Sequence, residues 1–270
     1  MPLPALDQPH ELDPSVVAEF TERGHCCVRA LADEQECAAY LPEIQAGVDR
    51  WHPAPTPIEE RDTYGKAFLQ AVALRSVHEP VRGFVESPRF ARVAAELMGV
   101  DGVRLYHDQA LFKEPGGGRT PWHQDQNYWP LDTDDIVTMW MPLVDLDPAV
   151  GSMIFVDGSH LDGNVGAGEI SDASDEAVQR SIDAGGRSTT THGALRAGDA
   201  TFHRGWTIHS AGPNPTDRMR PVMTVIWFAD GARVTAPDSP EQEFDLRTWL
   251  GGLSPGFLAT SEGNPRLWPT

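Results

Sequence analysis

From residue 103 onward the chain is a succession of short apolar segments, and this feature most restricts its fold. Each segment is rich in β-branched and aromatic residues and is bounded by Gly, Pro or Asp, which is typical of strands that end at turns. The segments are VRLYHDQALFK (103–113), IVTMWMPLV (136–144), SMIFVDG (152–158), GDATFHRG (198–205) and RPVMTVIWFAD (220–230). Several such strands in succession predict an all-β sandwich or barrel.

The first hundred residues have a helical texture instead. Asp13 and Pro14 supply N-cap and N1 signals and Gly24 supplies a C′ signal, so they predict a helix between them. Apolar residues at helical spacing from Cys37 to Trp51 predict an amphipathic helix. Further helices are predicted over 66–80, 87–98 and 174–183, and a short strand over HCCVRAL (25–31).

The length and composition favour one domain. A chain of 270 residues that is 40% hydrophobic can form a single large core. We expect a mostly helical support (1–100), a β-core (101–232) and a C-terminal tail (233–270). The segment 161–197 is polar and rich in Gly, and a loop of this length in a compact domain is usually a lid or a binding loop. We therefore expect it to cover a site.

The net charge of −19 restricts the partners. Nucleic acids and anionic membranes both need a basic surface, so the charge argues against them. No apolar run approaches the length of a membrane span. The three cysteines have neither zinc-like spacing nor a disulfide pattern, and the N-terminus has no signal-peptide features, which together favour a reduced cytoplasm. We expect a small-molecule substrate as the partner; an oligomeric state does not follow from the sequence.

The segment TPWHQDQNYWPL (120–131) places His123 and Asp125 two residues apart among aromatic residues. On a strand, residues i and i+2 point to the same face and can converge on one point. Two imidazoles and one carboxylate form the facial triad of non-haem Fe(II) oxygenases. The candidates for the second histidine are His160, His192, His203 and His209. His209, which is followed by a turn and an arginine-bearing strand, is preferred, and His203 is the alternative.

Four motifs in order resemble the phytanoyl-CoA dioxygenase family of Fe(II)- and 2-oxoglutarate-dependent oxygenases. They are PWHQDQNYWPL, VTMWMPLVDL, GSMIFVDGSH and GDATFHRGWTIHSAGPNPTDRMR, and the similarity spans residues 100–230. The resemblance implies a mainly β fold, a double-stranded β-helix of the jelly-roll or cupin type, with the site in its mouth. It also implies that His123, Asp125 and His209 are the iron ligands and the catalytic centre.

The resemblance also implies a 2-oxoglutarate pocket. Arg220, eleven residues after the distal histidine, matches the arginine that binds the far carboxylate of 2-oxoglutarate. Arg218 has the same strand parity, so the period alone cannot choose between the two arginines, and the resemblance selects Arg220. Lys113 falls where the family places a polar or cationic residue near the cosubstrate. Trp140 matches a tryptophan beside the same pocket, and Gln109 lies on a strand that reaches substrate or cosubstrate.

The cofactors implied by the resemblance are Fe(II), 2-oxoglutarate and dioxygen. The expected reaction converts 2-oxoglutarate to succinate and oxidises a C–H bond of a small organic substrate, with hydroxylation as the commonest outcome. Desaturation, ring closure and epimerisation remain open. The acidic charge makes an acyl-CoA an unfavourable substrate, so a neutral or cationic secondary metabolite or amino-acid derivative is preferred. Two other classes compete: a cupin-type metal-dependent isomerase, epimerase or hydrolase that uses no 2-oxoglutarate, and a non-catalytic binding module.

Overall fold

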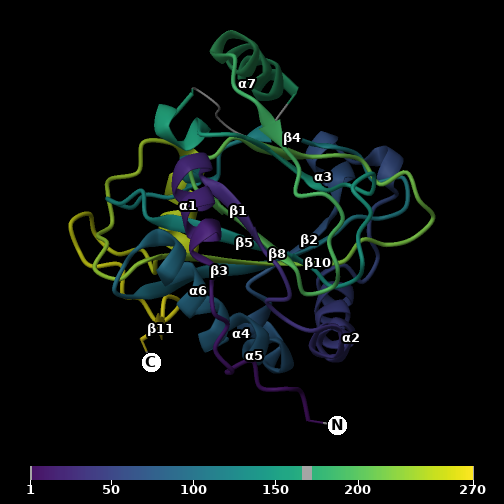
Figure 1. Cartoon of the computed structure of the whole chain (residues 1–270), viewed down its shortest axis with the longest axis horizontal. Helices are drawn as coiled ribbons and strands as arrows, with labels where there is room; N and C mark the ends of the chain where they lie inside the picture. The colour runs from purple at the N-terminus through teal and green to yellow at the C-terminus, as the bar shows by residue number, and fades with distance from the viewer. Residues whose placement is uncertain (1, 166–171, 270) are drawn as a thin grey trace.

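Two antiparallel β-sheets lie one above the other in the computed structural model of the chain, which describes residues 2–165 and 172–269 (Figure 1). The larger sheet has the strand order β1-β8-β5-β10-β3-β11, with β2 also paired to β3, and the smaller sheet has the order β4-β9-β6-β7. This architecture confirms the predicted double-stranded β-helix. The strands are β1 His25–Val28, β2 Leu69–Val72, β3 Val103–Phe112, β4 Thr120–His123, β5 Ile136–Pro142, β6 Met153–Val156, β7 Thr189–Thr190, β8 Ala200–Arg204, β9 His209–Ala211, β10 Val222–Ala229 and β11 Arg266–Trp268.

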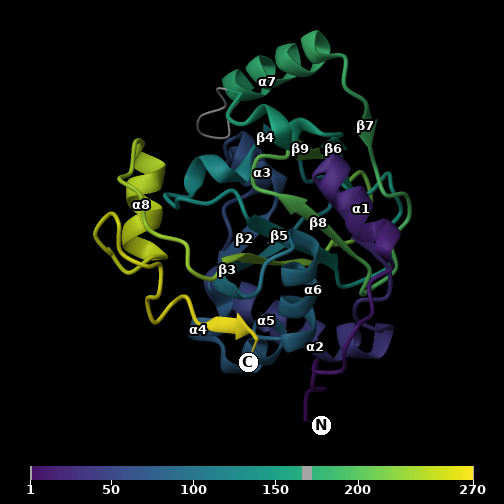
Figure 2. The ribbon, with the colours of Figure 1, turned by 60° about the vertical axis from the view of Figure 1, so that its left-hand side comes forward.

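Helices cover the outside of the sheets. Figures 1 and 2 show α2, α4, α5 and α6 below the larger sheet and α7 above β4. The α-helices are α1 Pro14–Arg23, α2 Glu34–Trp51, α3 Thr63–Ala67, α4 Leu74–Val77, α5 Arg82–Val85, α6 Pro88–Met98, α7 Asp172–Gly185 and α8 Pro240–Thr248. Short 3-10 helices are η1 Ile58–Glu60, η2 Glu79–Val81, η3 Asp125–Tyr128 and η4 Ser159–Asp162. The main apolar core lies between the larger sheet and the helices α2 and α4–α6.

The end signals of the first helix act as predicted. The Asp13 side chain accepts a hydrogen bond from the Ser15 backbone N–H, and Gly24 takes the left-handed conformation with φ 81°. Gly24 then leads directly into β1, which pairs with β8. The predicted strand at 25–31 and the predicted helices at 37–51, 87–98 and 174–183 are likewise confirmed within a few residues.

The predicted helix over 66–80 is wrong. The chain forms α3, then β2, then α4 there, and Ala73 lies between the last two with a left-handed φ of 51°. The strand β2 pairs with β3 in the register Ala71↔Ala110. The backbone hydrogen bonds that β2 gains at this edge of the larger sheet outweigh the helix propensity of its Leu, Gln and Ala residues, because intrinsic propensity is a weak preference that tertiary contacts override.

The segment expected to cover a site (161–197) and the expected C-terminal tail (233–270) both contribute to the fold. Within 161–197, Val178 and Ile182 of α7 pack with Val156 and Ile208, and β7 pairs with β6. Residues 166–171 of this segment lie outside the described part of the chain. The expected tail, 233–270, instead adds β11 to the edge of the larger sheet beside β3 and supplies α8.

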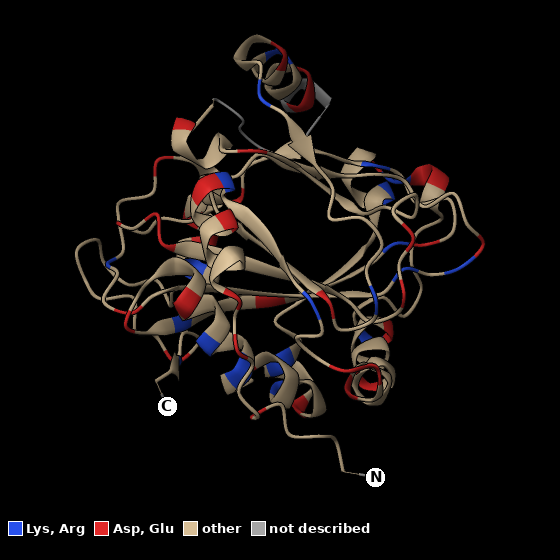
Figure 3. Cartoon of the chain, in the orientation of Figure 1, with Lys and Arg blue, Asp and Glu red and all other residues tan. Residues whose placement is uncertain are grey.

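The charge is distributed over the exterior. Figure 3 shows Asp and Glu on helices and loops all around the molecule rather than on one face. Within the described residues, no helix combines the length and the apolar character needed to cross a bilayer.

Candidate metal centre and cavity

The two histidines of the predicted triad are direct cross-strand partners. His123, at the end of β4, pairs with His209, at the start of β9, and their ring centroids are 4.1 Å apart. Side chains that face each other across an antiparallel pair lie close together by construction. The pairing of the smaller sheet therefore joins two histidines that are far apart in sequence.

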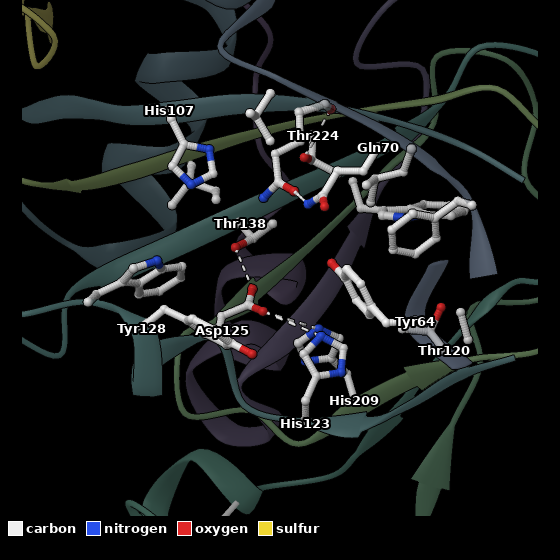
Figure 4. Close-up of a pocket in the computed structure, with 18 of the residues that line it drawn as sticks. Tyr64, Gln70, His107, Thr120, His123, Asp125, Tyr128, Thr138, His209 and Thr224 are labelled. Atoms are coloured by element: carbon white, nitrogen blue, oxygen red, sulfur yellow. Dashed lines mark hydrogen bonds and ion pairs between the residues drawn. The ribbon is translucent and has the colours of Figure 1, made fainter. Parts of the chain in front are cut away.

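Asp125 completes the triad from a turn rather than from a strand. The predicted strand ends at His123 and Asp125 opens η3, but Gln124 keeps an extended backbone (φ −127°, ψ 123°), so alternate side chains still point the same way. Oδ1 of Asp125 lies 3.5 Å from Nε2 of His123 and 3.6 Å from Nε2 of His209. One ligand atom from each residue lies within 4.8 Å of the other two, and Figure 4 shows the three side chains converging.

Hydrogen bonds fix the nitrogen that each imidazole presents. Nδ1 of His123 lies 2.8 Å from the Pro121 carbonyl, and Nδ1 of His209 lies 2.9 Å from the Thr207 carbonyl. A neutral imidazole carries one proton, so a proton on Nδ1 leaves a lone pair on Nε2 directed at the centre. Burial lowers the pKa of both histidines, which favours this neutral form. The donor set fits a divalent transition metal such as Fe(II).

The larger sheet holds the carboxylate. Oδ2 of Asp125 accepts hydrogen bonds from Oγ1 of Thr138 at 2.9 Å and from Nε2 of His203 at 3.1 Å. Thr138 and His203 are cross-strand partners on β5 and β8. With Oδ2 occupied, Oδ1 is the oxygen that faces the histidine pair. Desolvation opposes ionisation of Asp125, but the surrounding histidines outweigh it and lower its pKa well below the usual range.

His203, the alternative third ligand, lies behind the triad. Its Nε2 is directed at Asp125, and its Nδ1 is buried without a hydrogen-bond partner. His192 contacts His25, with 3.1 Å between ring nitrogens, and His160 packs beside Gly24. Neither His160 nor His192 is among the described residues that line the cavity around the triad.

We expect His203→Ala to retain one metal ion per chain but to bind it about 10- to 100-fold more weakly, because loss of a hydrogen bond that orients a metal ligand has this effect. His203→Gln, which keeps an N–H donor, should recover part of the affinity. Anaerobic competition titration with Fe(II) measures both. Complete loss of the metal in His203→Ala, with retention in His209→Ala, would contradict the choice of third ligand.

Arg220 is buried in the same cavity without an acidic partner. It is 2% exposed, and none of the ion pairs between described residues includes it. Its Nη1 donates to the Gly151 carbonyl at 2.6 Å, whereas its Nε is buried without a partner. The guanidinium carbon lies 5.2 Å from the Trp140 ring centroid. Burial lowers the pKa of Arg220 to about 9. Burying an unpaired charge costs roughly several kcal/mol of folding free energy, so this site suits an anionic ligand.

The other predicted cosubstrate residues surround Arg220 unequally. Trp140 and Gln109 line the cavity, and Gln109 accepts a hydrogen bond from the Gln70 amide at 2.5 Å. Lys113 is joined to Arg220 through a backbone bridge, but its Nζ donates to the Gly118 carbonyl at 2.5 Å and its side chain is absent from the described lining. Burial and the neighbouring Arg220 lower the pKa of Lys113 to about 7. Arg218 is exposed.

The cavity has a volume of about 640 Å³, with the cationic Arg220 at one end and the aromatic Trp249 at the other. His107, Gln109 and Leu111 alternate along β3 and line it, so it extends along that strand for roughly 13 Å at about 3.4 Å per residue. Arg220 lies beside Leu111, since its Nη2 is 3.4 Å from the Leu111 carbonyl. Trp249 lies beside His107, with ring centroids 4.7 Å apart.

Sequence reasoning missed several lining residues. They are Tyr64, Gln70, His107, Thr138 and Thr224, shown in Figure 4, and the α8 residues Glu241, Phe244 and Asp245 with Trp249. The spacing of the last four is a helical-face signal that the sequence does contain. None of the described residues of 161–197 lines the cavity, so the expected role of this segment as a cover stays a prediction.

Comparison with known proteins finds a family and relatives that agree with one another in their described activity. Residues 20–222 match the family described as phytanoyl-CoA dioxygenase (PhyH). A Stutzerimonas stutzeri protein named "Probable alpha-ketoglutarate-dependent hypophosphite dioxygenase" is 28% identical over 239 residues, which is 79% of this chain and 78% of the relative.

Solved structures of similar fold include enzymes of nogalamycin biosynthesis. The alpha-ketoglutarate-dependent carbocyclase SnoK has a TM-score of 0.76 at 24% identity and covers 96% of this chain and 99% of its own. The epimerase SnoN, in complex with Fe3+, alpha-ketoglutarate and nogalamycin RO, has a TM-score of 0.73 at 26% identity and covers 94% of this chain and 100% of its own. EctD from S. alaskensis, with 2-oxoglutarate and 5-hydroxyectoine, has a TM-score of 0.67 at 17% identity and covers 90% and 86%.

Proposed function

The chain belongs to the phytanoyl-CoA dioxygenase family, and from this premise we propose that it hydroxylates a C–H bond of a small organic molecule. It is an Fe(II)- and 2-oxoglutarate-dependent dioxygenase. We assign the iron to His123, Asp125 and His209, and the far carboxylate of 2-oxoglutarate to Arg220. The remainder of the cavity is assigned to the substrate.

The side chains of the cavity perform separate tasks in this proposal. When bound, the iron supplies the oxidation, in which 2-oxoglutarate and dioxygen become succinate and carbon dioxide while the substrate is oxidised. The Nε2 atoms of both histidines and Oδ1 of Asp125 would hold the metal. The Arg220 guanidinium offers a planar pair of donors that matches a carboxylate. Trp140 and the other aromatic walls exclude water from the reacting groups.

The buried, unpaired Arg220 is the observation that supports this function over its competitors. A metal-dependent isomerase or hydrolase without 2-oxoglutarate needs the triad but has no use for an uncompensated guanidinium in the same cavity. A binding module that merely retains the fold does not need three ligand atoms directed at one point. Here the Nδ1 hydrogen bonds of both histidines and the hydrogen bond from Thr138 to Asp125 direct them. A dicarboxylic cosubstrate accounts for both features together.

The dimensions and charge of the cavity favour an organic substrate of substantial size. Cavities of roughly 300–1,000 Å³ typically hold drug-sized ligands, and this one measures about 640 Å³. Hypophosphite, named for one relative, is an anion of very few atoms. The acidic side chains of Asp62, Glu241 and Asp245 line this cavity, and they disfavour anions. We therefore infer a neutral or cationic organic substrate.

Succinate release measured with a panel of small molecules tests the function. We expect Fe(II)-dependent formation of succinate from 2-oxoglutarate, with a rate that rises several-fold when a substrate is present. Mass spectrometry of the product then identifies the outcome: a gained oxygen atom indicates hydroxylation, an unchanged mass indicates epimerisation, and a loss of two hydrogens indicates ring closure or desaturation. An unchanged product mass for every accepted substrate would overturn hydroxylation. Product formation that is indifferent to 2-oxoglutarate would overturn the assignment of Arg220.

A further inference from the structure

The helix α8 forms a wall of the cavity at the end opposite Arg220. Glu241 and Asp245 face the cavity with Phe244, and Trp249 continues the same face just beyond the end of the helix. Residues spaced by three, four and eight positions lie on one side of a helix, so the sequence SPEQEFDLRTW builds this wall by its own periodicity. The match to the family ends at residue 222, so α8 lies outside the matched residues.

Asp245 is a buried carboxyl that lacks a positive partner. It is 6% exposed, and the hydroxyl of Tyr106 donates to its Oδ2 at 2.7 Å. The Trp249 side chain also forms a hydrogen bond with it. Both donors are neutral, and no ion pair within the described ranges includes Asp245. Burial therefore raises the pKa of Asp245 to about 7, and a bound cation would stabilise the ionised form.

His107 presents an unused ring nitrogen at the same end. Its side chain is 8% exposed and lines the cavity, and its Nδ1 is buried without a hydrogen-bond partner. Figure 4 places it across the cavity from His123 and His209. Burial lowers the pKa of His107 to about 4, so the ring is neutral and offers one lone pair. A buried polar atom without a partner is costly, which favours a ligand that donates to it.

Aromatic rings complete this end of the cavity. Tyr128, Trp129, Phe244 and Trp249 all line it, and Phe244 is 60% exposed at the rim. The face of an aromatic ring attracts a cation through its quadrupole. Among the described lining residues, Arg220 is the one cationic side chain, and it lies at the far end beside Leu111. Carboxylates and aromatic faces without a competing cation are the chemistry that recognises an ammonium group.

We propose that the substrate carries a protonated amine, which lies within the aromatic walls. Asp245 binds this amine as its counter-ion, and His107 accepts a hydrogen bond from it. An ammonium group has only N–H donors, so it satisfies both groups, whereas a carboxylate satisfies neither. The net charge of −19 also raises the concentration of cations around the protein as a whole. The identification of the bound amine as the substrate rests on the proposed function, but the binding site itself does not.

Three indoles that differ only in the end group test the proposal: tryptamine, tryptophol and indole-3-acetate. Their binding is measured calorimetrically without oxygen, to protein loaded with Fe(II) and 2-oxoglutarate. A charge-assisted hydrogen bond contributes more than a neutral one, so we expect tryptamine to bind about 10- to 100-fold more tightly than tryptophol, and indole-3-acetate to bind most weakly. Asp245→Asn should remove the preference for the amine. Glu243→Gln is the matched control, because Glu243 lies on the same helix but is exposed and pairs with Arg247.

A pH series on the unmodified protein gives a second readout that needs no substitution. Tryptamine affinity should rise between pH 6 and 8 as Asp245 ionises, whereas tryptophol affinity should stay flat. Two titratable groups at this end do not change charge in this window, because burial lowers the pKa of His107 to about 4 and raises the pKa of Tyr106 well above its usual value. Equal binding of amine and alcohol, no binding of either, or a preference that survives in Asp245→Asn would overturn the proposal. Amine binding without any succinate release would overturn the proposed function alone.

Discussion

His209→Ala and Asp125→Ala are each expected to lose stoichiometric iron and all substrate-dependent succinate formation. Each substitution removes one of three ligand atoms that share one metal ion, so the loss of affinity should exceed the roughly 100-fold upper range for loss of an outer hydrogen bond. Asp125→Ala also leaves Thr138 and His203 without their common acceptor. Metal analysis after anaerobic reconstitution, followed by a succinate assay, measures both effects.

Asp125→Asn separates the charge of this ligand from its shape. The amide keeps an oxygen that can accept a hydrogen bond from Thr138 or face the metal, but it lacks the negative charge that strengthens binding of a divalent ion. We expect iron affinity between those of the parent and Asp125→Ala, with activity close to that of Asp125→Ala. Full iron content and full activity in either alanine variant would contradict the ligand assignment, whatever the substrate turns out to be.

The triad illustrates what a linear pattern predicts well. His123 and Asp125 are two residues apart, and an extended backbone at Gln124 is sufficient to direct both at one point. His209 is different, because it reaches the same point only through the pairing of β4 with β9; the turn and the arginine-bearing strand that follow it favoured it among the four candidate histidines. The helix α1 was predictable for the same reason as the pair His123 and Asp125, since neighbouring signals at Asp13, Pro14 and Gly24 define its beginning and end. Features determined by a few neighbouring residues can be predicted from sequence.

The features that escaped prediction depend on contacts between distant segments. The strand β2 forms because one edge of β3 is free to accept it, and nothing within 66–80 itself indicates that edge. The clamp on Asp125 depends on the register that places Thr138 opposite His203. Likewise, α8 was predicted only as part of a tail, because its role depends on its packing beside η3 and on the contact of Trp249 with His107. Such residues become recognisable only once the packing is known.

Arg220→Ala should raise the apparent KM for 2-oxoglutarate by roughly a hundredfold while leaving the iron content near normal. Loss of one partner from a buried charged hydrogen-bond pair costs about 2 to 4 kcal/mol, and about 1.4 kcal/mol corresponds to each factor of ten. The variant protein itself should not be less stable for lack of the charge, because Arg220 has no acidic partner in the described structure that would be left unpaired.

Two further variants show that the shape and position of the guanidinium matter. Arg220→Lys keeps a positive charge but replaces the planar pair of donors with a point charge, so it should raise the KM severalfold rather than a hundredfold. Arg218→Ala is the matched control, because Arg218 shares the strand parity of Arg220 but is exposed, and it should leave the KM unchanged. Titration of 2-oxoglutarate against the iron-loaded proteins without oxygen gives the affinities directly. If Arg220→Ala binds 2-oxoglutarate as tightly as the parent, the anchor lies elsewhere in the cavity, and the buried guanidinium would then need another anion as its partner.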